Sequence, residues 1–154
     1  MLSNNVIFED TSAWDLVSKY IIGGVIAAPL IVGLVLLRFD IAGALVMFGV
    51  TVFDALFIRT VLPKKFVVYE DRLKIVLGWP VVIDIFFKDI IEIRQATRDM
   101  AYVYWGMRFA TSSKFIVEIR RRNGMNVIIS PSRGEEFIEQ LDRARGNWTE
   151  PRVF

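Results

Sequence analysis

The sequence predicts an α+β membrane protein, in which a two-helix transmembrane hairpin precedes a small β-domain that ends in one helix. Residues 20–58 form two apolar runs with a single polar break between them. From residue 65 onward, apolar residues recur at every second position, which is the spacing of β-strands. Near the C-terminal end the spacing changes to that of one amphipathic helix.

The two apolar runs are each long enough to cross a bilayer. Residues 20–37 carry no charge, and residues 41–58 carry only Asp54. As a helix, each run would span about 27 Å at about 1.5 Å per residue, close to a hydrocarbon thickness of about 30 Å. The alternative is a buried helical hairpin in a soluble protein, but neither run has a polar stripe to face water. We therefore expect a transmembrane hairpin over residues 14–62.

The polar break also predicts the topology. The link at residues 38–40 is too short to cross a membrane, so both ends of the hairpin lie on one side. Arg59, Lys64 and Lys65 follow the second run directly, whereas the link has no net charge. Basic residues near membrane ends remain cytoplasmic. We therefore expect a multi-pass protein of the inner (plasma) membrane, with both termini cytoplasmic and these three residues at the membrane surface.

Composition narrows the possible chemistry. The chain has 154 residues, a mean hydropathy of +0.43, and no Cys or His. It therefore forms no disulfide or thiolate metal site, and it lacks the commonest general base. We expect no metal and no cofactor.

The charge is distributed unevenly along the chain. Residues 1–58 hold two basic and five acidic residues, a net charge of −3, so the remainder carries +5 of the total of +2. This basic excess falls in the part expected beside the anionic cytoplasmic leaflet. The lipid bilayer is therefore the expected partner of this charge, and nucleic acid is not.

Small residues in the first apolar run indicate close helix packing. They form two small-xxx-small pairs, Gly23 with Ala27 and Gly24 with Ala28. Such pairs let a second helix approach closely. They either pack the hairpin itself, against Gly43, Ala44 and Gly49, or form an interface with another membrane protein, a second copy included.

Asp54 is the acidic residue within the membrane runs and is a functional candidate, because intramembrane charge is costly. It lies about one turn from the cytoplasmic end. Three roles remain open: an ion pair with Lys19 or Arg59, a contact with a partner, or proton or ion transport.

Two turns set the register of the predicted strands. A two-residue loop at Glu70 and Asp71 opposes Val68 to Leu73 and keeps the apolar side chains on one face. A three-residue loop at 122–124 opposes Ile119 to Val127, with Gly124 in a left-handed, bulged turn. A further strand is expected at 90–94. Residues 95–113 are ambiguous, and we expect one strand there with loops at each end, across Tyr102, Tyr104, Trp105, Met107 and Phe109.

The chain is expected to end in a capped helix and a tail. Ser132 and Glu135 have the spacing of a capping box. Four residues form one apolar face, Phe137, Ile138, Leu141 and Ala144. Gly146 is expected to end the helix. Residues 1–13 and 147–154 are expected to be tails.

About seven strands followed by one helix resemble a pleckstrin-homology (PH) barrel. Four stretches are similar to the bacterial PH-like families: residues 69–75 (YEDRLKI), 87–90 (FKDI), 112–115 (SSKF), and 129–131 with Glu136, Phe137 and Leu141. The resemblance implies a cytoplasmic PH-like β-barrel at residues 63–146, capped by its C-terminal α-helix. A five-stranded OB-type barrel is the alternative, but the terminal helix argues against it.

The resemblance also implies a function, a non-catalytic membrane-anchored module for protein binding or complex assembly. The alternative is a fixed accessory subunit of a larger membrane complex. PH domains that hold phosphoinositides use basic residues around the first hairpin loop. Here that loop is taken to be residues 70–72, which are acidic at two positions, so specific phosphoinositide binding is not expected.

Two other features carry weaker functional signals. Five carboxylates could serve an enzyme, Asp84, Asp89, Glu92, Asp99 and Glu118, but no nucleophile and base accompany them. The triplet Arg120-Arg121-Arg122 has the charge for lipid or nucleic acid, yet such a run is more often a solvated hairpin tip. We therefore expect no catalytic activity.

Overall fold

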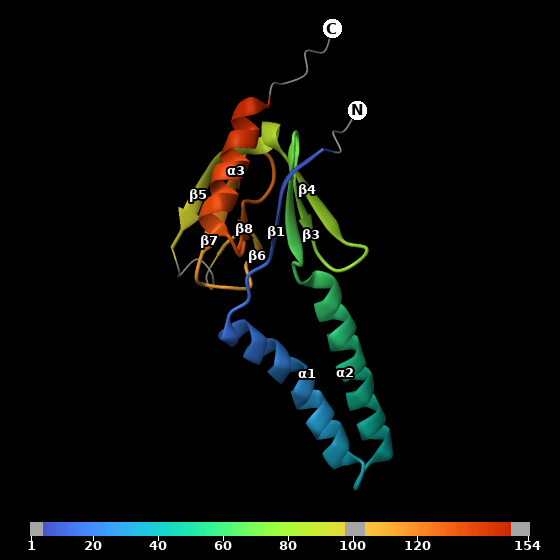
Figure 1. Ribbon diagram of the computed structural model, residues 1–154. Helices are drawn as coiled ribbons and strands as arrows, with labels where there is room; N and C mark the ends of the chain where they lie inside the picture. Colours follow the sequence, from blue (N-terminus) through green and yellow to red (C-terminus); the bar gives the residue numbers. More distant parts are fainter. Residues whose placement is uncertain (1–4, 98–103, 149–154) are drawn as a thin grey trace.

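The structure is a computed structural model that describes residues 5–97 and 104–148. Two long helices lie at one end, and two sheets with a third helix lie at the other (Figure 1). The elements in chain order are β1 (Val6–Thr11), α1 (Leu16–Leu36), α2 (Ile41–Val61), β2 (Lys65–Tyr69), β3 (Arg72–Val76), β4 (Val82–Phe86), the 3₁₀ turn η1 (Phe87–Asp89), β5 (Ile90–Ala96), β6 (Met107–Phe109), β7 (Ile116–Arg121), β8 (Val127–Ile129) and α3 (Gly134–Asn147).

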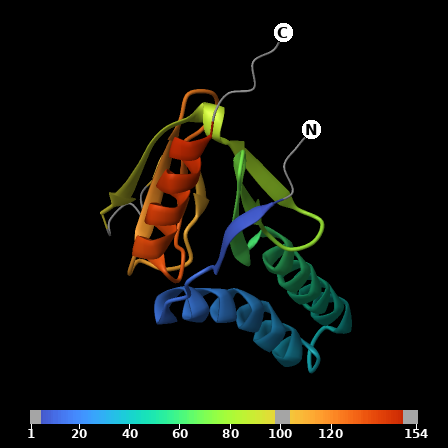
Figure 2. The same ribbon diagram turned by 45° about the horizontal axis from the view of Figure 1, so that its top comes forward.

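Helices α1 and α2 form the expected pair around the link at residues 37–40. Along their described lengths, the buried residues are Gly33 in α1 and Ala44 in α2. A Cβ on Gly33 would lie 2.9 Å from the ring of Phe48, so the two helices touch closely there. In Figures 1 and 2 they lie closest near the link and separate toward the sheets. Both helices are long and apolar enough to cross a membrane.

The β-domain holds two four-stranded sheets, with orders β1-β2-β3-β4 and β5-β7-β8-β6. Neighbouring strands are antiparallel, except that β6 runs parallel to β8. The expected barrel of about seven strands is therefore corrected to eight described strands that do not form a closed barrel. The 3₁₀ turn η1 separates β4 from β5, so no ladder joins these two outer strands in the described structure.

Both predicted turns are confirmed. Val68 pairs with Leu73 across the 70–71 turn, and Ile119 pairs with Val127 across the second turn. Gly124 has a φ of +91°, the left-handed region that the three-residue loop requires. These registers place alternate apolar side chains of both sheets in one core that α3 covers.

The expected tail at residues 1–13 is partly wrong, because Val6–Thr11 form β1 and pair with β2. Phe8 packs on the core, with its ring centroid 6.3 Å from that of Phe137. Asp10 is buried, and its carboxylate is satisfied by hydrogen bonds from the amides of Thr11 and Arg133, both at 2.8 Å. Residues 1–4 lie outside the described part. The helical hairpin is therefore inserted between two neighbouring strands of one sheet.

This insertion also changes which turn comes first in the domain. The helical hairpin joins β1 to β2, and the acidic turn at residues 70–71 joins β2 to β3. The turn that we compared with the ligand loop of phosphoinositide-binding domains is therefore the second connection of the sheet.

The expected capping box of the last helix is wrong. Helix α3 begins at Gly134, its N-cap is Arg133, and no side chain caps it. The hydroxyl of Ser132 lies 3.1 Å from that of Thr11, so β1 takes up the group that was expected to cap the helix. Gly146 lies inside α3, which ends at Asn147. The apolar face is confirmed, since Phe137, Leu141 and Ala144 are buried and Ile138 packs against the core. Residues 149–154 lie outside the described part.

Candidate functional site

The predicted membrane-surface residues gather where α2 meets the sheets. Arg59 in the last turn of α2 and Lys64 before β2 line one pocket of about 220 Å³, together with Leu56, Thr60 and Trp79. Lys65 lies in β2, where its Nζ is 3.0 Å from Oε1 of Glu9. The structure thus brings Arg59 and Lys64 together and gives Lys65 a carboxylate partner on β1.

The loop between β3 and β4 rests on the end of α2. The amide of Gly78 donates to the carbonyl of Thr60 at 3.0 Å. A Cβ on Gly78 would lie 1.8 Å from the carbonyl oxygen of Arg59, so this close approach requires glycine. The loop therefore holds Trp79, whose side chain is exposed, beside the last turn of α2.

Sequence reasoning recognised residues 78–80 only as a turn. The contact between Gly78 and α2 joins segments about 20 positions apart, and no local periodicity reports such a contact. The feature of the sequence that could have drawn attention to this site was a Trp in the first long turn after the apolar runs.

The start of α1 is attached to the second sheet. Asp15 is the N-cap of α1 and accepts from the amide of Ser18 at 2.8 Å and from that of Ser113 at 2.9 Å. Burial opposes the ionisation of Asp15, but these hydrogen bonds together outweigh it and lower its pKa below the usual value. Ala13 donates its amide to the carbonyl of Ser130 at 2.8 Å. Hydrogen bonds to the sheet domain therefore hold both the start of α1 and the end of α2.

The predicted helix-packing residues lie mostly on an open face. A Cβ on Gly23 or on Gly24 would meet no atom within 4 Å, so neither glycine packs against α2. Ala28 is exposed and Ala27 is half-buried. Asp54 is half-buried and forms no ion pair with any residue that the structure describes. Of the three roles left open, the ion pair with Lys19 or Arg59 is therefore not formed.

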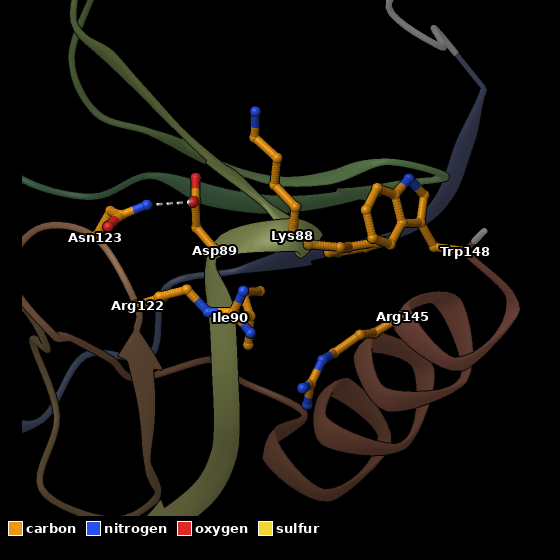
Figure 3. Close-up of a pocket in the computed structure, with 8 residues that line it drawn as sticks. Lys88, Asp89, Ile90, Arg122, Asn123, Arg145 and Trp148 are labelled. Atoms are coloured by element: carbon orange, nitrogen blue, oxygen red, sulfur yellow. Dashed lines mark hydrogen bonds between the residues drawn. The ribbon is translucent and has the colours of Figure 1, made fainter. Parts of the chain in front are cut away.

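A second pocket, of about 440 Å³, is shown in Figure 3. The end of α3, which lines it, lies at the end of the domain remote from the hairpin (Figure 1). The pocket is formed by η1, the β7–β8 turn and the end of α3, and its lining includes the basic residues Lys88, Arg122 and Arg145. Arg145 donates to the carbonyl of Ile91 at 2.8 Å, which fixes its position. Asp89 contributes a carboxylate to the same pocket. The excess of cations over carboxylates in this lining suits an anionic group.

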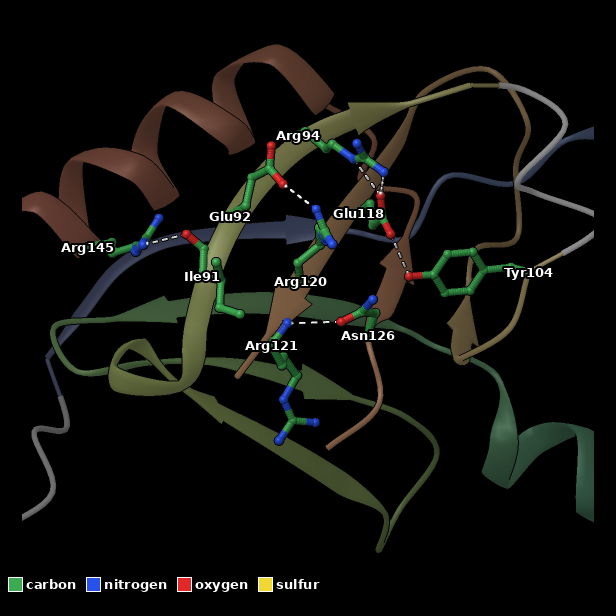
Figure 4. A network of polar contacts seen from close by, with 9 residues as sticks. All are labelled: Ile91, Glu92, Arg94, Tyr104, Glu118, Arg120, Arg121, Asn126 and Arg145. Atoms are coloured by element: carbon green, nitrogen blue, oxygen red, sulfur yellow. Dashed lines mark hydrogen bonds and ion pairs between the residues drawn. The ribbon is translucent and has the colours of Figure 1, made fainter. Parts of the chain in front are cut away.

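The outer face of the second sheet carries a network of paired charges (Figure 4). Glu118 is buried and accepts from Nε of Arg94 at 2.6 Å and from the hydroxyl of Tyr104 at 2.9 Å. Burial and this bond to a carboxylate raise the pKa of Tyr104, so it stays protonated above its usual range. Glu118 thus ties the segment before β6 to β7.

The other carboxylates considered as catalytic candidates also have partners. Glu92 lies 3.1 Å from Arg120, and Asp84 lies 3.5 Å from Arg72. Asp89 accepts from the side-chain amide of Asn123 at 3.4 Å. Asp99 and Tyr102 lie outside the described residues. Each described candidate therefore has a structural role in pairing strands or turns.

Comparison with known proteins gives one positive result. The family model for the bacterial PH domain matches residues 64–145, more than half of the chain. The match begins just before β2 and ends within α3, so β1, which completes the first sheet, precedes it. No curated protein and no solved structure matched the chain. The chain belongs to the bacterial PH domain family.

Proposed function

We propose that the protein is a non-catalytic, membrane-anchored binding module that holds its PH domain at the cytoplasmic face of the inner membrane. The observation that carries this proposal is the place of the hairpin in the fold. Helices α1 and α2 connect two paired strands, β1 and β2, and the other residues of both helices, apart from Gly33 and Ala44, are exposed or half-buried. A core helix of a soluble protein would bury its apolar surface, whereas a bilayer provides the apolar surroundings that such a surface needs.

The charge distribution supports the proposed orientation. Arg59 and Lys64 lie at the end of the hairpin that carries the domain, and the link at residues 38–40 has no net charge. Basic residues next to membrane spans favour the cytoplasmic side. The PH domain would then lie in the cytoplasm, beside the anionic leaflet.

The PH domain supports binding of a protein or a lipid. A protein partner is favoured for the remote pocket, because that pocket lies at the far end of β4 from the hairpin. Five residues of β4 at about 3.3 Å each separate the two ends by roughly 16 Å, beyond the reach of a lipid headgroup held in the leaflet. The basic lining, with Lys88 and Arg122, fits an acidic segment of a cytoplasmic or membrane protein.

A second candidate function is that of a fixed accessory subunit in a larger membrane complex. The open face at Gly23 and Gly24 favours it, since small residues without a neighbour in this chain allow close approach of another helix. Asp54 offers a polar contact to the same kind of partner.

Extraction and purification test the proposal. We expect the full-length protein to stay in membranes washed with alkaline carbonate and to co-purify with a partner after mild detergent extraction. Lys88→Glu/Arg122→Glu should keep the protein in the membrane and lose the partner. Release of the unaltered protein by carbonate would contradict the anchor.

A pair of helix variants separates the two candidates. Gly23→Leu/Gly24→Leu fills the open face of α1, and Gly146→Leu makes a matched change in α3, where a Cβ also meets no atom within 4 Å. Loss of a stoichiometric complex in the α1 variant, but not in the α3 variant, would favour the accessory subunit. Loss only in the variant of the remote pocket would favour the binding module.

A further inference from the structure

The most exposed apolar group near the hairpin is Trp79. This residue is 88% exposed, and Val81 and Val82, which follow it in the loop and in β4, are 41% and 46% exposed. A cluster of large apolar side chains that the domain leaves uncovered marks a contact surface. Gly78 fixes this cluster against α2, so its position relative to the helix end is set by the fold.

Trp79 shares its pocket with two cations and one apolar side chain. Arg59 and Lys64 line the pocket, and neither forms an ion pair with any residue in 5–97 or 104–148. Leu56, one turn earlier in α2, provides the apolar wall. Lys65, the next residue in sequence to Lys64, is neutralised by Glu9 and lies outside this pocket.

We propose that this pocket binds the phosphate group of an anionic phospholipid, with Trp79 lying at the boundary between headgroups and acyl chains. The guanidinium of Arg59 can donate two parallel hydrogen bonds to phosphate oxygens, and the ammonium of Lys64 adds a point charge. Indole rings favour this depth because they have an apolar body and one polar N–H. The inference rests on the proposed function, since it requires α2 to span the membrane.

The shared chemistry is a phosphate group, which a lipid or free inorganic phosphate could supply. The pocket favours the lipid, because Leu56 and Trp79 offer apolar surface that an acyl chain covers and a free phosphate does not. The position of the pocket at the end of α2 also favours the lipid, since a membrane-spanning helix ends where a headgroup would lie. Binding at this point would fix the orientation of the domain, with the remote pocket facing away from the bilayer.

Tryptophan fluorescence in vesicles tests the proposal. The chain has four Trp residues, so replacing Trp14, Trp105 and Trp148 by Phe leaves Trp79 as the reporter. A matched protein retains only Trp105, which is 97% exposed and adjoins the β7–β8 turn. Each full-length protein is reconstituted in vesicles that contain phospholipids brominated on the acyl chains. We expect strong quenching and blue-shifted emission for Trp79, and neither for Trp105.

Charge variants, made in the protein that retains only Trp79, test the phosphate contact. Titration with vesicles of increasing phosphatidylglycerol content measures the preference for anionic lipid. Arg59→Gln or Lys64→Gln should each weaken that preference about fivefold, from the attraction that one basic residue contributes near an anionic surface. Lys65→Gln should change this preference less, because the charge of Lys65 is already paired with Glu9. An equal effect of all three variants would overturn the pocket and leave only general surface attraction.

Three further outcomes show which part of the proposal is wrong. If inorganic phosphate in zwitterionic vesicles shifts the emission of Trp79 as phosphatidylglycerol does, the assignment to lipid is overturned. If Trp79 is no more quenched than Trp105 while the protein resists carbonate extraction, the site is wrong and the anchor stands. If carbonate extracts the protein, the proposed function itself fails.

A spin-label measurement avoids the Trp replacements. Val81→Cys and Asn123→Cys introduce single thiols into a chain that has none. Collision with oxygen, which dissolves in acyl chains, should broaden the signal of a nitroxide at position 81 more than that of one at position 123. Equal collision rates at both positions would contradict insertion of the loop.

Discussion

Gly124 takes a φ of +91°, a backbone conformation that side chains with a Cβ rarely adopt. It closes the turn between β7 and β8 and so sets the pairing of Ile119 with Val127. Both of these side chains are buried in the core. The conformation of one residue therefore sets which side chains of β8 enter the main core, Val127 and Ile129, and which one packs on the opposite face, Ile128. A slip of one position would exchange these faces.

Gly124→Val should destabilise the domain by roughly 1–2 kcal/mol, the cost of a left-handed backbone for a residue with a Cβ. The free energy of unfolding would be measured on the full-length protein in mild detergent by near-ultraviolet circular dichroism. Gly146→Val is the matched control, because Gly146 lies inside a helix where a Cβ meets no atom within 4 Å. Equal stability of the two variants would refute the role assigned to the left-handed turn.

Strand β1 connects the elements of the domain to the hairpin. It completes the first sheet, its Asp10 binds the amide of Arg133 at the start of α3, and Asp15 just beyond it caps α1. Because β1 and β2 flank the hairpin and pair with each other, their ladder holds the two ends of the hairpin side by side at the domain. The attachment of α1 is thus part of the folded domain.

Asp15 makes this attachment sensitive to acid. Hydrogen bonds from Ser18 and Ser113 lower the pKa of its carboxyl in the folded state. A group with a lowered folded pKa stabilises the fold above its unfolded pKa, near 3.8, and loses that contribution as the pH falls through the folded value. Asp15→Asn should therefore be less stable than the unaltered protein at pH 7, and the difference should shrink below the ordinary carboxyl pKa. A difference that stays constant across this pH range would contradict the account.

Elements with a strong local signal were predictable from the sequence. The apolar runs gave α1 and α2, and the turn chemistry around residues 70–71 and 122–124 gave two registers that the structure confirms. Strand β1 was missed because its main contribution to the core is the single ring of Phe8, while Val6 and Ile7 are exposed. The burial of Asp10 depends on Arg133, more than 120 positions away, and no local pattern reports it.

The same reason explains the errors at the ends of α3. Ser132 and Glu135 have the spacing of a capping box, but a neighbouring strand competes for the hydroxyl of Ser132. The local sequence predicted that Ser132 caps the helix, but its hydroxyl instead contacts that of Thr11. At the candidate site, Arg59 and Lys64 were predictable from the positive charge after the hairpin, whereas Trp79 was not. Its place follows from the approach of Gly78 to α2, which only the fold establishes.

The whole molecule has two ends with different chemistry. One end holds the apolar hairpin, with Arg59, Lys64 and Trp79 where it meets the sheets. The other end holds the basic pocket between η1 and the end of α3 (Figure 3). In the proposed arrangement the first end lies in and on the membrane, and the second end faces cytoplasmic partners. In that arrangement, one small domain would bind lipid and protein at the same time.

Cysteine labelling in intact cells tests this arrangement most directly, because the natural chain contains no Cys. Phe39→Cys places one thiol in the exposed link between α1 and α2, and Glu139→Cys places one on the exposed side of α3. With a membrane-impermeant thiol reagent, we expect Phe39→Cys to react in intact cells and Glu139→Cys to react only after the cells are permeabilised. Labelling of Glu139→Cys in intact cells, with Phe39→Cys protected, would contradict both the transmembrane hairpin in this orientation and the cytoplasmic PH domain.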